Sequence, residues 1–371
     1  MQLRWSLPVA LTLTTLAAYA APQAPESPAV ATAPAVAAAP DVAALTSGLI
    51  LQNFDRTVRP QDDLYRFVNG NWLKNTEIPP DKSNYGAFTL LSDEAEKNLR
   101  VIVEEAAAAN AAAGSDQQLI GDYYSSFMDE AKAEQLGIKP LRPELDRIAA
   151  IQDRKQLLDY LARAQLLMID NPVGAQVFAD AKNPDLNTLW VTQSGLGLPE
   201  RDYYFSEEKR FVEIRAAYEK HIDNVLKLAG RKDSAAVAKE IMAFETRIAK
   251  ASWPAVKMRD IEKLYNPVTV ADAEKATPGI DWSTWLTQMT LPGSGQMVLT
   301  QPDYFQEVGK AIDDVPLATW KDYLALRAID TYSPYLSKAF VDENFDFYQR
   351  TLSGTPQIKP RWKRALAELE G

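Results

Sequence analysis

Apolar residues recur at intervals of three and four along most of this chain, and that spacing restricts its fold more than any other feature. The clearest run is Phe211, Ile214, Tyr218, Ile222 and Val225, which share one face of a helix. A helix with one apolar face has to bury that face against other elements. The spacing therefore predicts a mainly α protein, a multi-helical lobe.

Glycine and proline separate the helical segments and so indicate where each helix ends. Ser92 is expected to cap the first long helix, because its hydroxyl can accept a backbone N–H of the first turn. The expected helices cover the ranges 92–113, 116–136, 153–169, 206–229, 235–251, 301–312 and 320–340, with short helices over 259–290.

One segment has a period of two instead. Val173, Ala175 and Val177 alternate with other side chains, a turn is expected over 182–185, and a returning run covers 189–192. This pattern predicts a small β-hairpin. A loop with two glycines follows it, over residues 194–205, where a tight turn is a better interpretation than a phosphate-binding loop.

The stretch Asp62–Leu91 is dense in aromatic residues, asparagine and glycine. Asp62 or Asp63 can cap a short helix, and Asn69-Gly70-Asn71 is expected to end it, because glycine and asparagine tolerate positive φ. Pro79-Pro80 then requires an extended exit. Aromatic side chains between fixed turns suggest a path that is pinned either in the core or in the wall of a cleft.

The first residues predict export. Residues 1–20 resemble a signal peptide, with Arg4 at the start, an apolar run, and Ala18-Tyr19-Ala20 as the cleavage site. An uncleaved anchor is the alternative. Residues 21–50 are rich in alanine and proline and are expected to form a linker, which leaves 51–371 as the folded region. The expected location is periplasmic or extracellular.

Composition excludes several kinds of site. The chain has no cysteine, so it has no thiolate nucleophile, no cysteine-ligated zinc and no iron–sulfur cluster. It has no disulfide either, so packing must supply its stability. The formal net charge of −10 argues against a nucleic-acid-binding protein, whose footprint would be basic.

A search for catalytic groups finds no complete set, so no catalytic and no metal-ligating residue is assigned. His221 is the only histidine and lies on an expected helix, where a role in packing is favoured over that of a general base. No Gly-x-Ser-x-Gly motif is present. Arg201 and Asp202 are expected to form a buried ion pair in their aromatic loop, in preference to acting in catalysis.

Several motifs occur in a recognisable order along the chain. Asp63–Leu73 looks like the motif D-x-Y-x-[YF]-x-x-G-x-W-L, and Tyr85–Phe88 fits the Y-G-x-F that follows it. Gly195–Tyr204 is similar to the loop G-L-x-L-P-x-R-D-Y-Y. Together with Glu245–Trp253 and Phe345–Trp362, these segments resemble the neprilysin/endothelin-converting-enzyme family of zinc metallopeptidases. The resemblance covers nearly all of the folded region.

The resemblance implies a two-lobed enzyme of which this sequence is the N-terminal, helical part. The family binds zinc through a His-Glu-x-x-His helix and a downstream glutamate, and neither motif occurs here. Zinc is therefore expected in the full-length family enzyme and not on this chain alone. The implied partners are peptide substrates and the missing catalytic lobe, with no nucleic acid and no membrane span after signal cleavage.

The resemblance also implies three substrate-binding positions: Asn84, Phe88 and Ser92. Some relatives have arginine where Asn84 and Ser92 stand, and an amide or hydroxyl cannot pair with a substrate carboxylate as arginine does. Weak or no preference for a substrate's C-terminal carboxylate is therefore expected. Phe88 is expected either to line a specificity pocket or to belong to the core.

Two functions remain open: the N-terminal region of an exported zinc metalloendopeptidase, inactive by itself, or a non-catalytic periplasmic or secreted binding protein with the same fold. The apolar stripe Ile358, Trp362, Leu366 and Leu369 favours the first, because an uncovered apolar face needs a partner.

Overall fold

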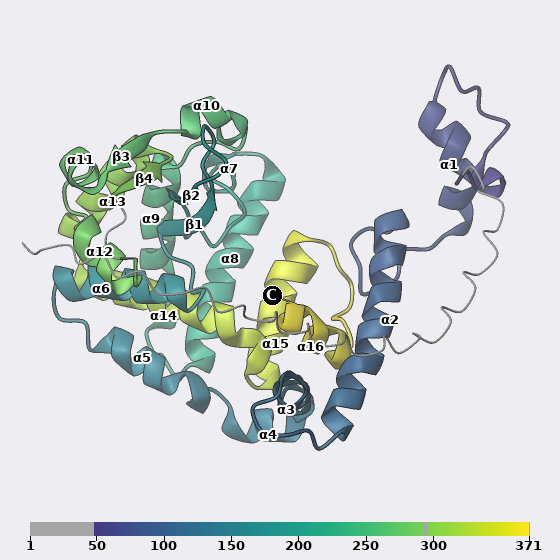
Figure 1. Cartoon of the computed structure of the whole chain (residues 1–371), viewed down its shortest axis with the longest axis horizontal. Helices are drawn as coiled ribbons and strands as arrows, with labels where there is room; N and C mark the ends of the chain where they lie inside the picture. Colours follow the sequence, from purple (N-terminus) through teal and green to yellow (C-terminus); the bar gives the residue numbers. More distant parts are fainter. Residues whose placement is uncertain (1–47, 292–294, 371) are drawn as a thin grey trace, which may run out of the picture. The chain divides into compact units, whose positions relative to one another are not determined.

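The computed structural model describes residues 48–291 and 295–370 (Figure 1). The expected signal peptide, and the linker up to residue 47, lie outside the described residues. Contacts divide the chain after Glu77 into a short N-terminal unit and a main unit that begins at Ile78. No helix in the described ranges is long and apolar enough to cross a membrane.

The N-terminal unit contains a turn of 3₁₀-helix, η1 (Leu51–Asn53), and the helix α1 (Leu64–Asn75). Asp63 caps α1 as the sequence predicts, because its carboxylate accepts the backbone N–H of Arg66 at 2.9 Å.

The prediction that Asn69-Gly70-Asn71 ends this helix is wrong. Gly70 is buried against Asp55, where an added Cβ would lie 2.5 Å from the Asp55 Cβ. The side-chain amide of Asn71 donates to the carbonyl of Phe54 at 2.8 Å. Contacts with the preceding segment thus hold two turn-forming residues in a helix.

The main unit is helical as far as Leu166, and its first helix starts at a different residue from the expected one. α2 begins at Ala87 rather than at Ser92, since extended backbone at Gly86 ends the proline-containing segment and no helix breaker follows it. Asn110, with φ of +44°, follows its end. The five helices are α2 (Ala87–Ala108), α3 (Asp116–Met128), α4 (Glu130–Leu136), α5 (Arg142–Ala149) and α6 (Arg154–Leu166).

The predicted hairpin is confirmed and belongs to a larger sheet. β1 (Val173–Ala179) pairs antiparallel with β2 (Asn187–Gln193). β4 (Gln296–Leu299) lies parallel to β2 on its other side, and β3 (Pro267–Thr269) forms the far edge. The order β1-β2-β4-β3 was not foreseen, because β3 and β4 are too short to show a period of their own.

Helices complete the main unit. The expected helix over 320–340 is two helices, because Ser333-Pro334 starts a 3₁₀ turn between them. The elements are α7 (Asp202–Phe205), α8 (Lys209–Leu228), α9 (Ser234–Ala251), α10 (Ile261–Leu264), α11 (Val270–Ala276), α12 (Trp282–Gln288), α13 (Pro302–Asp314), α14 (Leu317–Tyr332), α15 (Lys338–Asn344), the π-helix η5 (Phe345–Leu352) and α16 (Arg361–Glu370).

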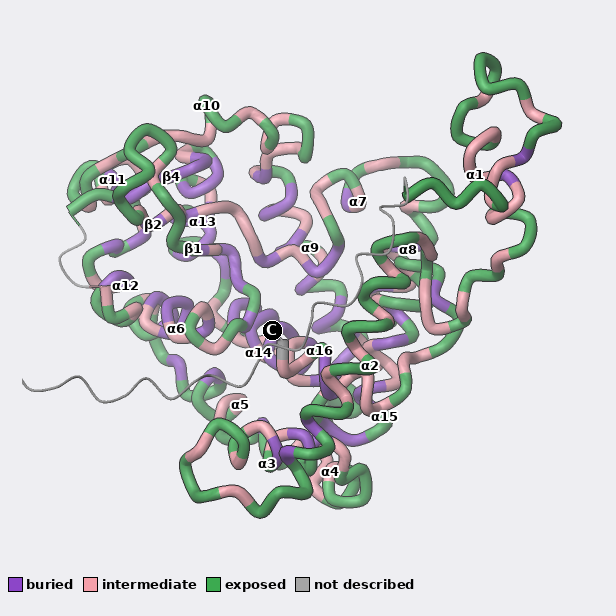
Figure 2. Tube along the Cα trace, turned by 45° about the vertical axis from the view of Figure 1, so that its right-hand side comes forward, coloured by how far each residue is buried: buried purple, intermediate pink, exposed green. Residues whose placement is uncertain are grey.

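Two apolar clusters hold the main unit together, and the fold is mainly α as predicted. The larger joins the sheet to the helices around α9 and α14 and buries Trp282, Trp285 and Trp320 completely. The smaller joins α2, α3 and α16. Figure 2 shows α2 as mostly exposed or half-buried, with only Val103 and Ala106 buried.

The smaller cluster corrects one sequence inference. Leu366 of the terminal stripe is 2% exposed, and Trp362 and Leu369 pack against the same cluster. Three of the four stripe residues are thus covered by α2 and α3 of this chain, and half-buried Ile358 lines a cavity formed by this chain. The stripe therefore gives no evidence for a missing partner.

Candidate functional site

The three positions singled out from the sequence line one surface pocket. Asn84 lies just before α2, and Phe88 and Ser92 lie one helical turn apart at its start, where side chains four residues apart share a face. The pocket has a volume of about 390 Å³. The C-terminal part of the chain contributes Gln349, Thr355 and Lys359 to its lining.

Phe88 belongs to this pocket and not to the core. Its side chain is 90% exposed, which excludes the core alternative. Ser92 lies inside α2 and is also exposed, so its hydroxyl faces the surroundings and does not cap the helix. Phe88 therefore offers an apolar surface for contact with a ligand.

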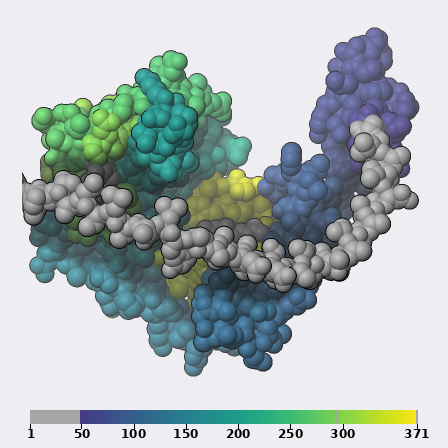
Figure 3. All heavy atoms as spheres, in the orientation of Figure 1, coloured from purple at the N-terminus to yellow at the C-terminus, as the bar shows by residue number. Residues whose placement is uncertain are grey.

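A network of charged residues lines part of the pocket and continues beside it. Lys82 Nζ lies 2.7 Å from Asp93 Oδ1, and both side chains are largely buried. Lys363 of α16 contacts Asp93 at 3.4 Å and Glu96 at 3.2 Å, and Lys359 Nζ lies 3.7 Å from Glu96 Oε1. This network joins the start of α2 to the C-terminal segment, which lie next to one another in Figure 3.

The network favours the charged forms of Asp93 and Lys363. Burial opposes ionisation of Asp93, but Lys82 and Lys363 outweigh it and hold the pKa of Asp93 below its usual value. Burial likewise disfavours the charged form of Lys363, while Glu96, Asp81 and Asp93 raise its pKa. The charges of Asp93 and Lys363 are thus compensated by opposite charges beside them.

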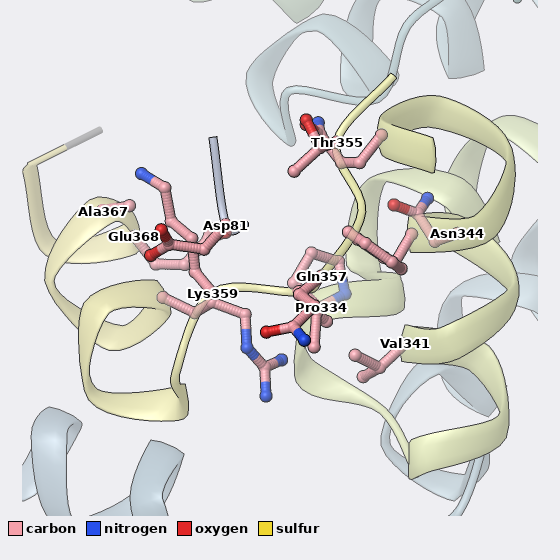
Figure 4. A pocket seen from close by; sticks show the side chains of 13 residues that line it. Asp81, Pro334, Val341, Asn344, Thr355, Gln357, Lys359, Ala367 and Glu368 are labelled. Carbon is pink, nitrogen blue, oxygen red and sulfur yellow. The ribbon is translucent and has the colours of Figure 1, made fainter. Parts of the chain in front are cut away.

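The segment Thr355–Lys359 separates this pocket from a second cavity of about 290 Å³. The backbone N–H of Gln357 donates to the carbonyl of Pro80 at 2.9 Å, which attaches the segment to the chain before α2. Figure 4 shows Lys359 and Glu368 on one side of the second cavity, with Val341 and Asn344 on the other.

The loop over residues 194–205 is built into the interior. Glu245 of α9, fully buried, accepts the backbone N–H of Gly197 at 3.2 Å and the hydroxyls of Tyr204 and Tyr218 at 2.7 and 2.9 Å. Burial raises the pKa of Glu245, although Arg327 and these donors act in the opposite direction. The Glu245 carboxylate thus connects two family motifs, Gly195–Tyr204 and Glu245–Trp253, by hydrogen bonds.

Two glycines allow the loop to lie so close to the core. Gly195 has φ of +82°, and its added Cβ would come within 2.5 Å of the Tyr323 hydroxyl. At Gly197 an added Cβ would lie 1.7 Å from the Tyr218 hydroxyl. The expected pair in this loop is not buried: Arg201 Nε lies 4.0 Å from Asp202 Oδ1, and the Asp202 side chain is 58% exposed.

His221 takes part in packing, and its ring is 1% exposed. Its nitrogens lie 3.2 Å from Asp330 and 3.2 Å from Glu343. Burial lowers the pKa of His221, but the two carboxylates outweigh burial and raise it to about 9. Across 48–291 and 295–370, no group of three or more His, Cys, Asp or Glu side chains could hold a metal ion.

Sequence reasoning missed the part of the pocket that comes from the C-terminal segment. Lys359, Gln349 and Thr355 lie more than 250 residues from Phe88 in the sequence, and no spacing rule connects them. The only available signal was the motif resemblance of Phe345–Trp362, which marks the segment without stating where it packs.

The profile of peptidase family M13, in its N-terminal part, matches residues 60–371. The chain is similar to the solved zinc metalloprotease Zmp1 of Mycobacterium tuberculosis in complex with inhibitor, at 38% identity and a TM-score of 0.83, over 88% of this chain and 50% of that one. It is 27% identical to human endothelin-converting enzyme 1 over 86% of this chain and 43% of the relative. For human endothelin-converting enzyme-like 1 the identity is 28%, over 80% and 40%. The chain thus spans half the length of these relatives or less.

Proposed function

Because this chain belongs to peptidase family M13, the neprilysin/endothelin-converting-enzyme family recognised from its motifs, we propose that it is the N-terminal region of an exported zinc metalloendopeptidase. The enzyme would cleave peptides or small proteins. This region would form part of the wall that holds the substrate.

The observation that carries the proposal is the pocket at the start of α2. The family resemblance implies Asn84, Phe88 and Ser92 as substrate-binding positions, and all three line this pocket. An exposed aromatic ring beside polar groups and compensated charges suits an extended peptide, which offers both apolar side chains and backbone polar groups.

The zinc site is assigned to the half of the relatives that this chain does not span. The described residues do not fit zinc, since no ligand group is present among them and both ring nitrogens of His221 face carboxylates. In the complete enzyme zinc would activate a water molecule and polarise the scissile carbonyl. The residues of this chain would bind and orient the peptide.

Export is proposed from residues 1–20, which have the charge, apolar run and cleavage site of a signal peptide. N-terminal sequencing of the protein recovered from the producing cell tests this. A mature chain that starts after Ala20 is expected, and an intact Met1 on the recovered protein would contradict cleavage.

The function itself is tested with the purified chain, a set of fluorescent peptides, and zinc. We expect peptide binding that Phe88→Ala weakens, no stoichiometric zinc by elemental analysis, and no hydrolysis by mass spectrometry. Zinc-dependent hydrolysis that survives purification would contradict the assignment of the chemistry to another region. Absence of any peptide binding would contradict the assignment of the pocket.

A further inference from the structure

The pocket at the start of α2 contains a positive charge that the sequence motifs do not reveal. Asn84 and Ser92 carry none, and from them alone weak recognition of a substrate carboxylate is expected. Lys359, from the segment before α16, lines the same pocket. The cation is therefore supplied from the other end of the chain.

Of the two lysines that line the pocket, Lys359 is the one available to a ligand. Lys82 is 9% exposed and lies 2.7 Å from Asp93, so a ligand would have to break a close, buried ion pair to reach it. Lys359 is 41% exposed, and its shortest ion pair, to Glu96, is 3.7 Å long. A pair of that length and exposure contributes little to stability.

If Lys359 pairs with a ligand in place of Glu96, the largely buried Glu96 carboxylate still has a cationic partner. Glu96 is 15% exposed and also lies 3.2 Å from Lys363 Nζ. Lys363 therefore remains as its partner when Lys359 turns to a ligand. This shared arrangement lowers the free energy that an incoming anion must supply.

The backbone that leads to Lys359 is fixed at two points. Gln357 is bonded to Pro80, and the backbone N–H of Thr355 donates to the carbonyl of Gln349 at 3.0 Å. Lys359 is thus presented from an anchored segment to the pocket that Phe88 also lines. An anchored cation near an exposed aromatic ring suits a carboxylate that is attached to an apolar group.

We propose that Lys359 is a specificity-determining residue, which binds a carboxylate of a peptide whose apolar part lies on Phe88. The proposal rests on the proposed function and replaces the expectation of weak carboxylate preference. The carboxylate comes from the C-terminus of the peptide or from an acidic side chain. Both have the same chemistry and are separated by experiment.

The experiment measures the affinity of fluorescent peptides for the full 371-residue chain by anisotropy. One pair of peptides differs only in a C-terminal carboxylate or amide, and the other pair, both amidated, differs only in Glu or Gln. The chain should bind the acidic member of one pair about three- to tenfold more tightly, as expected for one charge-assisted contact at a partly exposed site. The pair that shows the preference identifies the source of the carboxylate.

The variant Lys359→Met should remove that preference, and Lys359→Arg should retain it. Lys310→Met is a matched control, since Lys310 is 67% exposed and lies 3.6 Å from Glu307 on α13. It should leave the preference unchanged.

The outcomes separate this inference from the proposed function. Equal binding within both pairs, or a preference that persists in Lys359→Met, overturns the role of Lys359 while the peptide pocket stands. If none of the four peptides binds the unmodified chain, the peptide pocket is overturned and the role of Lys359 with it.

Discussion

Two stretches of this chain look alike in sequence and each lines a surface pocket, but they differ in how deeply their motif residues are buried. Residues 84–92 and residues 194–205 both carry family motifs, and both combine glycine with aromatic and aliphatic residues. Around the second stretch, buried Glu245 binds Gly197 and Tyr204. In the first, Phe88 is 90% exposed.

The difference shows that a recognisable motif does not by itself mark a binding site. The loop 194–205 is recognisable because its close approach to buried side chains allows few substitutions. The stretch 84–92 has no such restriction at Phe88, so its aromatic ring is available to a ligand. We therefore expect changes in the loop to alter stability, and changes at the start of α2 to alter binding.

The largest effect on stability is expected from Gly197→Ala. The new Cβ would lie 1.7 Å from the hydroxyl of buried Tyr218, which cannot move without disturbing the Glu245 network. A loss of about 3 kcal/mol or more in the free energy of unfolding is expected, measured by chemical denaturation. Gly86→Ala is the matched control, because nothing lies within 4 Å of its added Cβ. Similar losses in both variants would contradict the contrast between the two stretches.

The second largest effect is expected from Glu245→Gln, a loss of about 2 to 4 kcal/mol in the free energy of unfolding. The amide cannot accept all three hydrogen bonds that the carboxylate accepts, and it no longer compensates the charge of Arg327. The same change at exposed Glu94 of α2 is the control and should cost less than about 0.5 kcal/mol. A neutral result at Glu245 would show that the loop does not depend on this carboxylate.

The free energy of unfolding should also depend on pH, through the protonation of His221. Its pKa is raised from 6.5 to about 9 in the folded chain. The stabilisation that protonated His221 gains from its two carboxylate partners is therefore fully present below pH 6.5 and is lost as the pH rises through about 9. The change should be on the order of 2 to 3 kcal/mol, measured as free energy of unfolding between these pH values.

The variant His221→Gln isolates this contribution, because His221 is the only histidine and the chain has no cysteine. Its stability should be nearly constant over the same pH range. An equally steep pH dependence in the variant would exclude His221 as the titrating group.

The smallest effect on stability is expected from Phe88→Ala. A side chain that is 90% exposed loses almost no buried area on truncation, so the free energy of unfolding should change by less than about 0.5 kcal/mol. Thermal unfolding of the variant beside the unmodified chain measures this. A loss above 2 kcal/mol would place Phe88 in the interior and remove it from the pocket.

The sequence predicted most of the fold because long helices and the hairpin have periods that a single segment displays. It failed at Asn69–Asn71, where the contacts of Gly70 and Asn71 with the preceding segment override their turn preference. It missed β3 and β4, whose pairing is set by neighbouring strands.

The candidate site was predicted in part. Asn84, Phe88 and Ser92 lie within nine residues, so a motif could identify all three. Lys359 lines the pocket because the C-terminal part of the chain packs on the start of α2, where Gln357 is bonded to Pro80. No local pattern encodes such contacts between distant parts of the chain.

Hydrogen–deuterium exchange of the chain with and without a bound peptide tests the central contrast most directly. Residues 84–92 and 355–359 should exchange more slowly when the peptide is bound, while residues 194–205 should exchange slowly in both states and remain unchanged. Protection confined to residues 194–205, with none at the start of α2, would contradict the account.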